Sequence, residues 1–229
     1  MAIIHRTTVI PSKLELLSAW LPAQPWYLDR GRDPELARAG GFRLDDPAGE
    51  VGIEFMVVTD GSGDAATAYL VPMTYRASAL PGAEDALIGT AEHGVLGRRW
   101  IYDGTRDPVL VAQLAALIQG AAEPQAQSVS DTPDPTVTVL PVVGGYLAAV
   151  ESGITGNGPS GTDLRIETAD ADGTRTGRLN IRLNRVLQPD GAAQPDGGAA
   201  SGAAGQPCLF APWRLPDGTP VRGALVTTS

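Results

Sequence analysis

The sequence predicts an α+β fold: an antiparallel sheet with a few helices, followed by a β-rich region packed against it. Three observations lead to this prediction. Two segments in the first half carry helix caps, and the runs between them alternate apolar and polar residues with period two. After about residue 136 the chain shows only short strand-like runs separated by turn residues.

The first helix is expected over SKLELLSAW, residues 12–20. Ser12 is placed to cap its N-terminus, and Glu15 follows at the spacing of a capping box. Pro22 should end the helix, because proline lacks the N–H that the next turn needs and its ring clashes with the preceding turn. Leu14, Leu17 and Leu21 fall on one face, with Leu16 and Trp20 beside it, which suggests that the helix covers the apolar side of a sheet.

The second helix is expected over DPVLVAQLAALIQG, residues 107–120. Asp107 is its predicted N-cap, Pro108 takes the first turn and Gly120 ends it. Its apolar face is wide, which predicts a largely buried helix.

Strands are expected between these helices, at FRLDD (42–46), VGIEFMVVTD (51–60) and TAYLVPMTYR (67–76). The short polar connections between them predict an antiparallel meander. RRWIYD (98–103) reads as a further short strand, whereas the glycine-rich stretch around EHG (92–94) reads as a loop.

The second half reads as β throughout, and two Asp-Gly turns, DADGT (170–174) and LPDGT (215–219), predict hairpins. GITGNGPSGTD (153–163) is expected to be a long hairpin loop, since it has neither the lysine nor the following helix of a phosphate-binding loop. Residues 188–207 are of low complexity and predict a mobile loop. The expected organisation is a first domain at 1–122, a linker or exposed loop at 123–135, and a β-rich region at 136–229 that either stands alone or completes a single domain.

Composition argues against several functional classes. The net charge of −9 and the pI of about 4.6 disfavour nucleic acid as a partner, because an acidic surface repels phosphate backbones. Cys208 is the single cysteine, so an intramolecular disulfide is excluded, and no metal site or cofactor is expected. The N-terminus lacks the pattern of a signal peptide and no run is long enough to cross a membrane, so we expect a cytoplasmic protein without membrane attachment.

The stretch WLPAQPWYLD (20–29) concentrates aromatic residues in a chain that has few. Trp26 and Tyr27 could stack on a sugar ring, with Arg30 close by in sequence. The more frequent fate of tryptophan is core packing, and the break at Pro22 favours an anchor between helix and sheet.

A second group of candidate contacts lies before the second predicted helix. Glu92 and His93 could form an acid–base pair, although sequence neighbours in a strand point to opposite sides, and a loop residue is the alternative for His93. Arg98, Arg99 and Trp100 could hold an acidic ligand or partner, or could be satisfied by internal ion pairs. No residue is assigned a catalytic role.

SAWLPAQPWYLDRGR (18–32) resembles the opening of bacterial maltokinases and related aminoglucoside-type sugar kinases, and IGTAEHGVLGRRWIYDGTRDPVLVAQLAALI (88–118) resembles the end of their N-terminal cap. The resemblance covers about residues 10–120. The resemblance implies a curved antiparallel sheet with helices. The chain looks most like small free-standing actinobacterial proteins that have such a cap and no kinase catalytic lobe.

The residues do not support kinase activity. Phosphoryl transfer in kinase-like folds needs a lysine on a strand, a catalytic-loop aspartate and metal-binding acids. Lys13 is the only lysine and lies in the first predicted helix, and neither histidine opens a catalytic-loop motif. Glucan branching is not supported either, because it needs a large barrel with paired carboxylates.

The leading hypothesis is therefore a non-catalytic interaction or regulatory protein of maltose/trehalose–α-glucan metabolism, with a sugar kinase or another enzyme of that metabolism as partner. The alternative is a small-ligand or sugar-binding module, and an enzyme using Glu92 and His93 comes third. A binding module predicts exposed, convergent aromatic residues, whereas an interaction protein predicts an exposed apolar patch or sheet edge. The sequence gives no oligomeric state.

Overall fold

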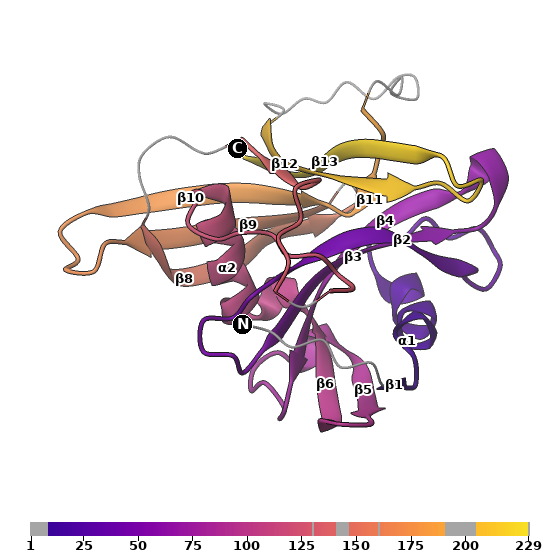
Figure 1. Cartoon of the computed structure of the whole chain (residues 1–229), viewed down its shortest axis with the longest axis horizontal. Helices are drawn as coiled ribbons and strands as arrows, with labels where there is room; N and C mark the ends of the chain where they lie inside the picture. Colours follow the sequence, from indigo (N-terminus) through magenta and orange to yellow (C-terminus); the bar gives the residue numbers. More distant parts are fainter. Residues whose placement is uncertain (1–8, 130, 141–146, 160, 191–204, 229) are drawn as a thin grey trace.

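The computed structural model describes residues 9–129, 131–140, 147–159, 161–190 and 205–228 (Figure 1). Helix α1 (Lys13–Trp20) forms as its caps predict: Glu15 N donates to Ser12 Oγ at 3.3 Å, and Ser12 N donates to Glu15 Oε2 at 2.7 Å. A 3₁₀ turn, η1 (Leu21–Ala23), follows at the predicted proline break. The two hydrogen bonds between Ser12 and Glu15 satisfy backbone N–H groups that have no partner within the helix at its start.

Helix α2 (Pro108–Ile118) is also confirmed, with Asp107 as N-cap and Pro108 in the first turn. Asp107 Oδ1 accepts a hydrogen bond from Val109 N at 3.0 Å, and its carboxylate also pairs with Arg76 at 2.6 and 2.7 Å. The cap is therefore tied to a strand as well as to its own helix.

The predicted meander is confirmed by β2 (Leu36–Leu44), β3 (Gly52–Asp60) and β4 (Thr67–Arg76), which pair antiparallel in that order. Two strands follow, β5 (Leu87–His93) and β6 (Gly97–Asp103), and β6 pairs with β4. The prediction of a loop around EHG is wrong: Glu92 and His93 belong to β5, which pairs with β6 on one side and with the two-residue β1 (Val9–Ile10) on the other. The 3₁₀ turns of this region are η2 (Gly63–Ala65), η3 (Glu84–Ala86) and η4 (Gly104–Arg106).

The second half contributes only strands among the described residues. They are β7 (Thr138–Val139), β8 (Ala148–Gly158), β9 (Gly161–Ala169), β10 (Thr176–Asn184), β11 (Val186–Leu187), β12 (Gln206–Arg214) and β13 (Pro220–Thr228). The long loop expected at 153–163 is instead mostly strand, because β8 and β9 continue pairing as far as Gly158 and Gly161. The mobile loop expected at 188–207 falls largely on 191–204, which lie outside the described residues.

All these strands belong to one sheet, in the order β1-β5-β6-β4-β3-β2-β12-β13-β10-β9-β8, with β11 beside β4 and β7 beside β12. The halves of the chain pair where β2 meets β12, at Gly40 and Trp213, and also where β4 meets β11. A Cβ at Gly40 would lie 2.9 Å from Pro212 O and 3.2 Å from Trp213 Cβ, so glycine permits this close approach. The proposed division at residues 123–135 stays a prediction; Gln125 there exchanges backbone hydrogen bonds of 2.9 Å with Arg43 of β2.

Strands β3 and β4 are buried on both faces of the sheet. On one face, α1 and Trp26 pack on a cluster that includes Met56, Val58 and Tyr69. On the other face, α2 packs on a larger cluster drawn from both halves of the chain. Figure 1 shows the two helices on different parts of the sheet, with α1 near β5 and α2 near β8 and β9.

The fold is therefore more β-rich than the balanced α+β fold that the sequence predicts. The antiparallel sheet and its helices are confirmed, but α1 and α2 are only 8 and 11 residues long. The reason is the second half, whose period-two runs all pair into the same sheet.

Candidate functional site

Trp26 is an internal anchor. Its side chain is 0% exposed, and its ring lies 5.8 Å from the ring of Trp20 and 6.0 Å from that of Tyr69. The guanidinium of Arg185 lies over it at 5.0 Å. Trp26 therefore has no surface to offer a ligand in this structure, and its place among the candidate contacts is corrected to core packing, since both faces of the ring are covered by protein.

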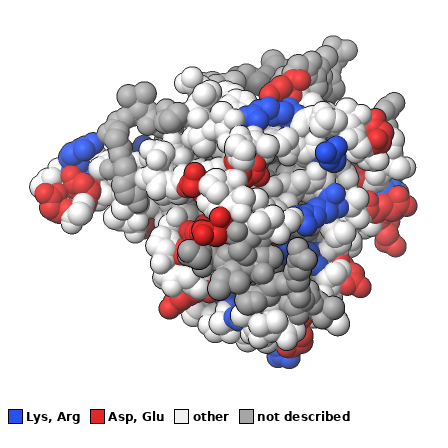
Figure 2. Space-filling model, viewed as in Figure 1, with Lys and Arg blue, Asp and Glu red and all other residues white. Residues whose placement is uncertain are grey.

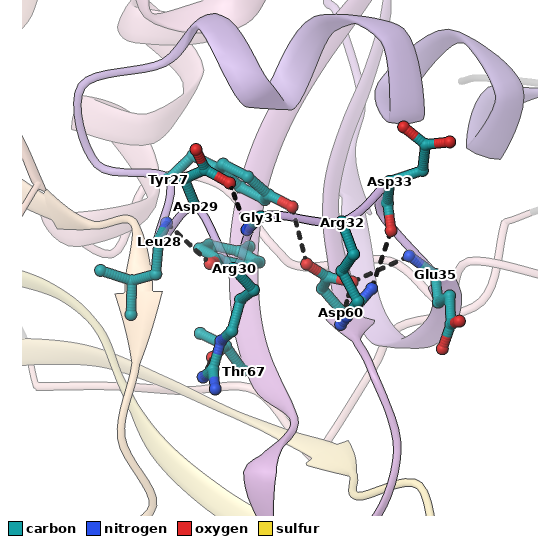
Figure 3. Close-up of polar contacts among 11 residues, drawn as sticks. Tyr27, Leu28, Asp29, Arg30, Gly31, Arg32, Asp33, Glu35, Asp60 and Thr67 are labelled. Atoms are coloured by element: carbon teal, nitrogen blue, oxygen red, sulfur yellow. Dashed lines mark hydrogen bonds and ion pairs between the residues drawn. The ribbon is translucent and has the colours of Figure 1, made fainter.

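The segment after Trp26 crosses the end of the sheet and is fixed there by a buried carboxylate, Asp60, at the end of β3 (Figure 3). Asp60 accepts a hydrogen bond of 2.8 Å from the Tyr27 hydroxyl, one of 3.0 Å from Arg32 Nη2 and one of 2.9 Å from Glu35 N. We call residues 27–35 the strap. The strap is held by charged hydrogen bonds, which are stronger than neutral ones.

Two residues of β4 hold the first half of the strap. Tyr69 stacks on the Tyr27 ring with centroids 5.5 Å apart, and its hydroxyl accepts from Leu28 N at 3.1 Å. Arg30 Nη2 donates to Thr67 Oγ1 at 2.8 Å, and Arg30 is an exposed residue.

The charge of the strap disfavours an anion site. Its two arginines, Arg30 and Arg32, stand among the carboxylates of Asp29, Asp33, Glu35 and Asp60. An added anion would meet more negative than positive groups, so the geometry fits a positioning role for the arginines better than ligand capture.

Tyr27 makes the strap sensitive to alkaline pH. Burial and the hydrogen bond to Asp60 raise the pKa of Tyr27 from its ordinary value of 10.0 to about 12. Because the folded pKa lies above the unfolded one, the Tyr27 contribution to stability is complete below pH 10 and is lost as the pH rises through 12. We expect urea-unfolding curves of the protein to show a loss of stability over this pH window that is smaller in Tyr27→Phe; equal losses in the two proteins would contradict this role.

The β5–β6 hairpin separates the remaining candidates onto two faces. Glu92 and Arg98 are directly opposite each other and form an exposed ion pair of 2.8 Å, and Trp100 and Thr90 form the next opposed pair on the same side. Trp100 is half-buried against Leu80, Ala83, Ala86 and Tyr102.

His93 and Arg99 have the opposite orientation, which they share with the buried Ala91 on the α1 side of the sheet. His93 Nδ1 accepts hydrogen bonds from Val95 N at 3.3 Å and Leu96 N at 3.1 Å, so it shapes the hairpin turn. The structure therefore does not bring Glu92 and His93 together as an acid–base pair. Arg99 Nη2 donates to Leu96 O at 2.7 Å.

Exposed apolar side chains gather where this hairpin meets β1. Val95 and Leu96, in the turn, are 60% and 46% exposed, and Ile10, which is opposite Glu92 on β1, is 67% exposed. We call Ile10, Val95 and Leu96 the apolar corner. Large apolar side chains that are exposed singly are common, but several at one edge of a sheet indicate an interaction site.

Sequence reasoning missed a polar cluster under the start of α1. Glu54, on β3, is buried and accepts from Lys13 Nζ at 2.5 Å, from the Tyr75 hydroxyl at 2.6 Å and from Gln127 Nε2 at 3.0 Å. Burial and the Glu54 charge raise the pKa of Tyr75 well above its ordinary value. No local signal connects these residues, because their separations in sequence reach 73 residues.

The described residues contain no group of three or more His, Cys, Asp or Glu side chains placed to hold a metal ion. No helix among them is both long and apolar enough to cross a bilayer. Charged groups of both signs are interspersed over the face shown in Figure 2, among wide uncharged areas.

The strap, the hairpin and the strands between them all lie in one part of the chain that is related to a known family. Residues 20–107 match the family model described as the maltokinase N-terminal cap domain. This part of the protein is a cap-like domain. The match confirms the resemblance in the strap and the hairpin, and it covers less than half of the chain. A comparison with curated proteins finds no match.

Proposed function

We propose that this protein is a non-catalytic interaction or regulatory partner in cytoplasmic maltose/trehalose–α-glucan metabolism, and that it binds a sugar kinase or another enzyme of that metabolism through its cap-like domain. The family match supports the association with kinase-like proteins, since the matched domain is by description part of maltokinases.

The apolar corner is the observation that carries the proposal. A sugar-binding module predicts convergent, exposed aromatic rings, yet Trp26 is fully buried and Tyr27 is engaged with Asp60. An interaction protein predicts exposed apolar residues at a sheet edge, as at Ile10, Val95 and Leu96. The exposed apolar side chains of the hairpin turn in the cap-like domain, and of the neighbouring β1, therefore favour a protein partner over a carbohydrate.

The position of Lys13 supports a non-catalytic role. A kinase-like fold places its phosphate-binding lysine on a strand beside the nucleotide. Lys13 is the only lysine of this chain; it lies on α1, and its ammonium is bound to Glu54. The Lys13–Glu54 ion pair therefore links α1 to β3.

The test is binding of the purified protein to maltokinase and to maltosyltransferase, measured by size-exclusion co-elution and by biolayer interferometry. We expect a complex with one of them that the double substitution Val95→Asp/Leu96→Asp weakens at least about tenfold, because it places charges in the desolvated centre of the interface. Val150→Asp is the matched control, since Val150 is 66% exposed on β8 at the other end of the sheet. Failure to bind either enzyme, or equal effects of the two changes, would count against the proposal.

A second candidate, a sugar-binding module, has one observation in its favour. Thr90, Glu92, Arg98 and Trp100 share one face of the β5–β6 hairpin, which places an aromatic ring beside polar groups. Titration calorimetry with maltose, trehalose, maltose 1-phosphate and glycogen separates the two candidates, because only the second produces heat with these ligands.

A further inference from the structure

A shallow hollow of about 310 Å³ lies on the strands at the far end of the sheet, outside the cap-like domain. Its lining comes from two neighbouring strands: Glu151, Ser152, Gly153, Ile154 and Thr155 on β8, and Arg165 and Glu167 on β9. The volume is at the lower end of the range for small-molecule sites. The hollow can therefore admit a small molecule and is too open to enclose a large one.

The hollow faces away from the α2 core. Leu164 and Ile166 of β9 point into that core, so Arg165 and Glu167, which alternate with them, point to the other side. Gly153 is directly opposite Arg165, and a Cβ at Gly153 would meet no atom within 4 Å. The missing side chain of Gly153 leaves open space opposite Arg165 in the hollow that both residues line.

On this face two ion pairs form between β9 and β10, and Arg165 and Glu151 belong to neither of them. Arg178 pairs with Glu167 at 2.8 Å, and Arg182 pairs with Asp163 at 2.6 Å. Arg165 lies between these two pairs. Within the described part of the chain, neither Arg165 nor Glu151 has a hydrogen-bond or ion-pair partner for its side chain.

The position of Glu151 adds a second requirement for the ligand. Glu151 is directly opposite Glu167, and like charges opposed across two strands are destabilising. A positive donor placed next to Glu151 would relieve this repulsion. Arg165 is the diagonal neighbour of Glu151. Its guanidinium would bind a carboxylate of the ligand, through two parallel hydrogen bonds.

We propose that this hollow binds a small zwitterionic molecule, with its carboxylate on Arg165 and its ammonium on Glu151. The two strand positions are diagonal neighbours, roughly 7–8 Å apart at Cα, and both side chains are long enough to close on a ligand whose charges are separated by a few bonds. A dianion is disfavoured by the two glutamates, and a simple cation leaves Arg165 unused.

The test is calorimetric titration of the full chain with three molecules of the same chain length. 4-Aminobutyrate carries both charges, butyrate carries only the carboxylate, and butylamine carries only the ammonium. We expect 4-aminobutyrate to bind at least about tenfold more tightly than either single-charge analogue, and Arg165→Gln or Glu151→Gln to weaken it by a similar factor. Arg214→Gln is the control, since Arg214 is an exposed arginine on β12 whose bond is to Gly218 O.

Circular dichroism would verify that each variant is folded, which keeps a loss of binding attributable to the hollow. No heat with 4-aminobutyrate would overturn the proposal, as would equal binding of butyrate or an unchanged affinity in Glu151→Gln. These outcomes are independent of whether the apolar corner binds an enzyme.

Discussion

Replacing Arg185 with alanine is expected to lower the free energy of unfolding by about 3–5 kcal/mol, because it breaks a buried ion pair from one side. The Arg185 side chain is 1% exposed. Its Nη2 donates to Asp103 Oδ2 at 2.5 Å and its Nε donates to Thr162 Oγ1 at 2.8 Å. Without the guanidinium, the Asp103 carboxylate keeps its place in the interior and loses the cation that neutralises it.

Urea unfolding of Arg185→Ala is the measurement, and Arg178→Ala is the matched control. Arg178 also forms an ion pair of 2.8 Å, with Glu167, but both partners are exposed, so its loss is expected to cost about 0–1 kcal/mol. The double substitution Arg185→Met/Asp103→Leu should recover much of the loss, because no charge is then left buried and unpaired. A loss in Arg185→Ala no larger than that in Arg178→Ala would contradict this account.

The Arg185 pair also joins the two halves of the chain. Asp103 and Trp26 belong to the cap-like domain, whereas Arg185 and Thr162 belong to the second half. Burial lowers the pKa of Arg185, and the Asp103 charge opposes this shift, so the ion pair offsets part of the cost of burying the guanidinium. The second half is thereby fixed to the cap-like domain by charge as well as by strand pairing.

Local signals predicted the helices and the meander. The capping box of Ser12 and Glu15, and the Asp107–Pro108 start of α2, act over a few residues, so the sequence displays them directly. Strand β5 was missed because a contact with a residue distant in the sequence determines one of its positions. Gly89 breaks its pattern, and the structure shows why: a Cβ there would lie 2.7 Å from Leu16 Cδ2, a contact with α1 that no local pattern shows.

The candidate sites were less predictable than the fold. Glu92, Arg98 and Trp100 share a face because β5 pairs with β6, which the prediction of a loop at EHG did not include. Asp60 was seen only as the end of a strand, and its bonds to Tyr27 and Arg32 span 33 and 28 residues. Such contacts follow from the register of distant strands, which single-residue preferences do not determine.

Trp26→Ala is expected to destabilise the protein by about 3–5 kcal/mol, the usual cost of deleting a large buried ring. The indole fills the space between α1, β4 and Arg185, and the ring of Tyr69 lies 6.0 Å away. Trp100→Ala is the matched control, since Trp100 is only half-buried, and its loss should cost clearly less. Thermal and urea unfolding measure both, and equal losses would show that the buried Trp26 ring contributes no more to stability than the half-buried Trp100.

Trp26→Phe and a double-mutant cycle with Arg185 separate packing from charge. Trp26 Nε1 is buried without a hydrogen-bond partner among the described residues, so phenylalanine removes an unsatisfied donor as well as ring area, and its cost should fall well below that of alanine. The Arg185 guanidinium lies 5.0 Å from the Trp26 ring, within the range of a cation–π contact. We therefore expect Trp26→Ala and Arg185→Ala to be non-additive by about 0.5–3 kcal/mol. Additive losses would mean that the Trp26 ring and the Arg185 guanidinium are not energetically coupled, so that the ring contributes apolar packing only.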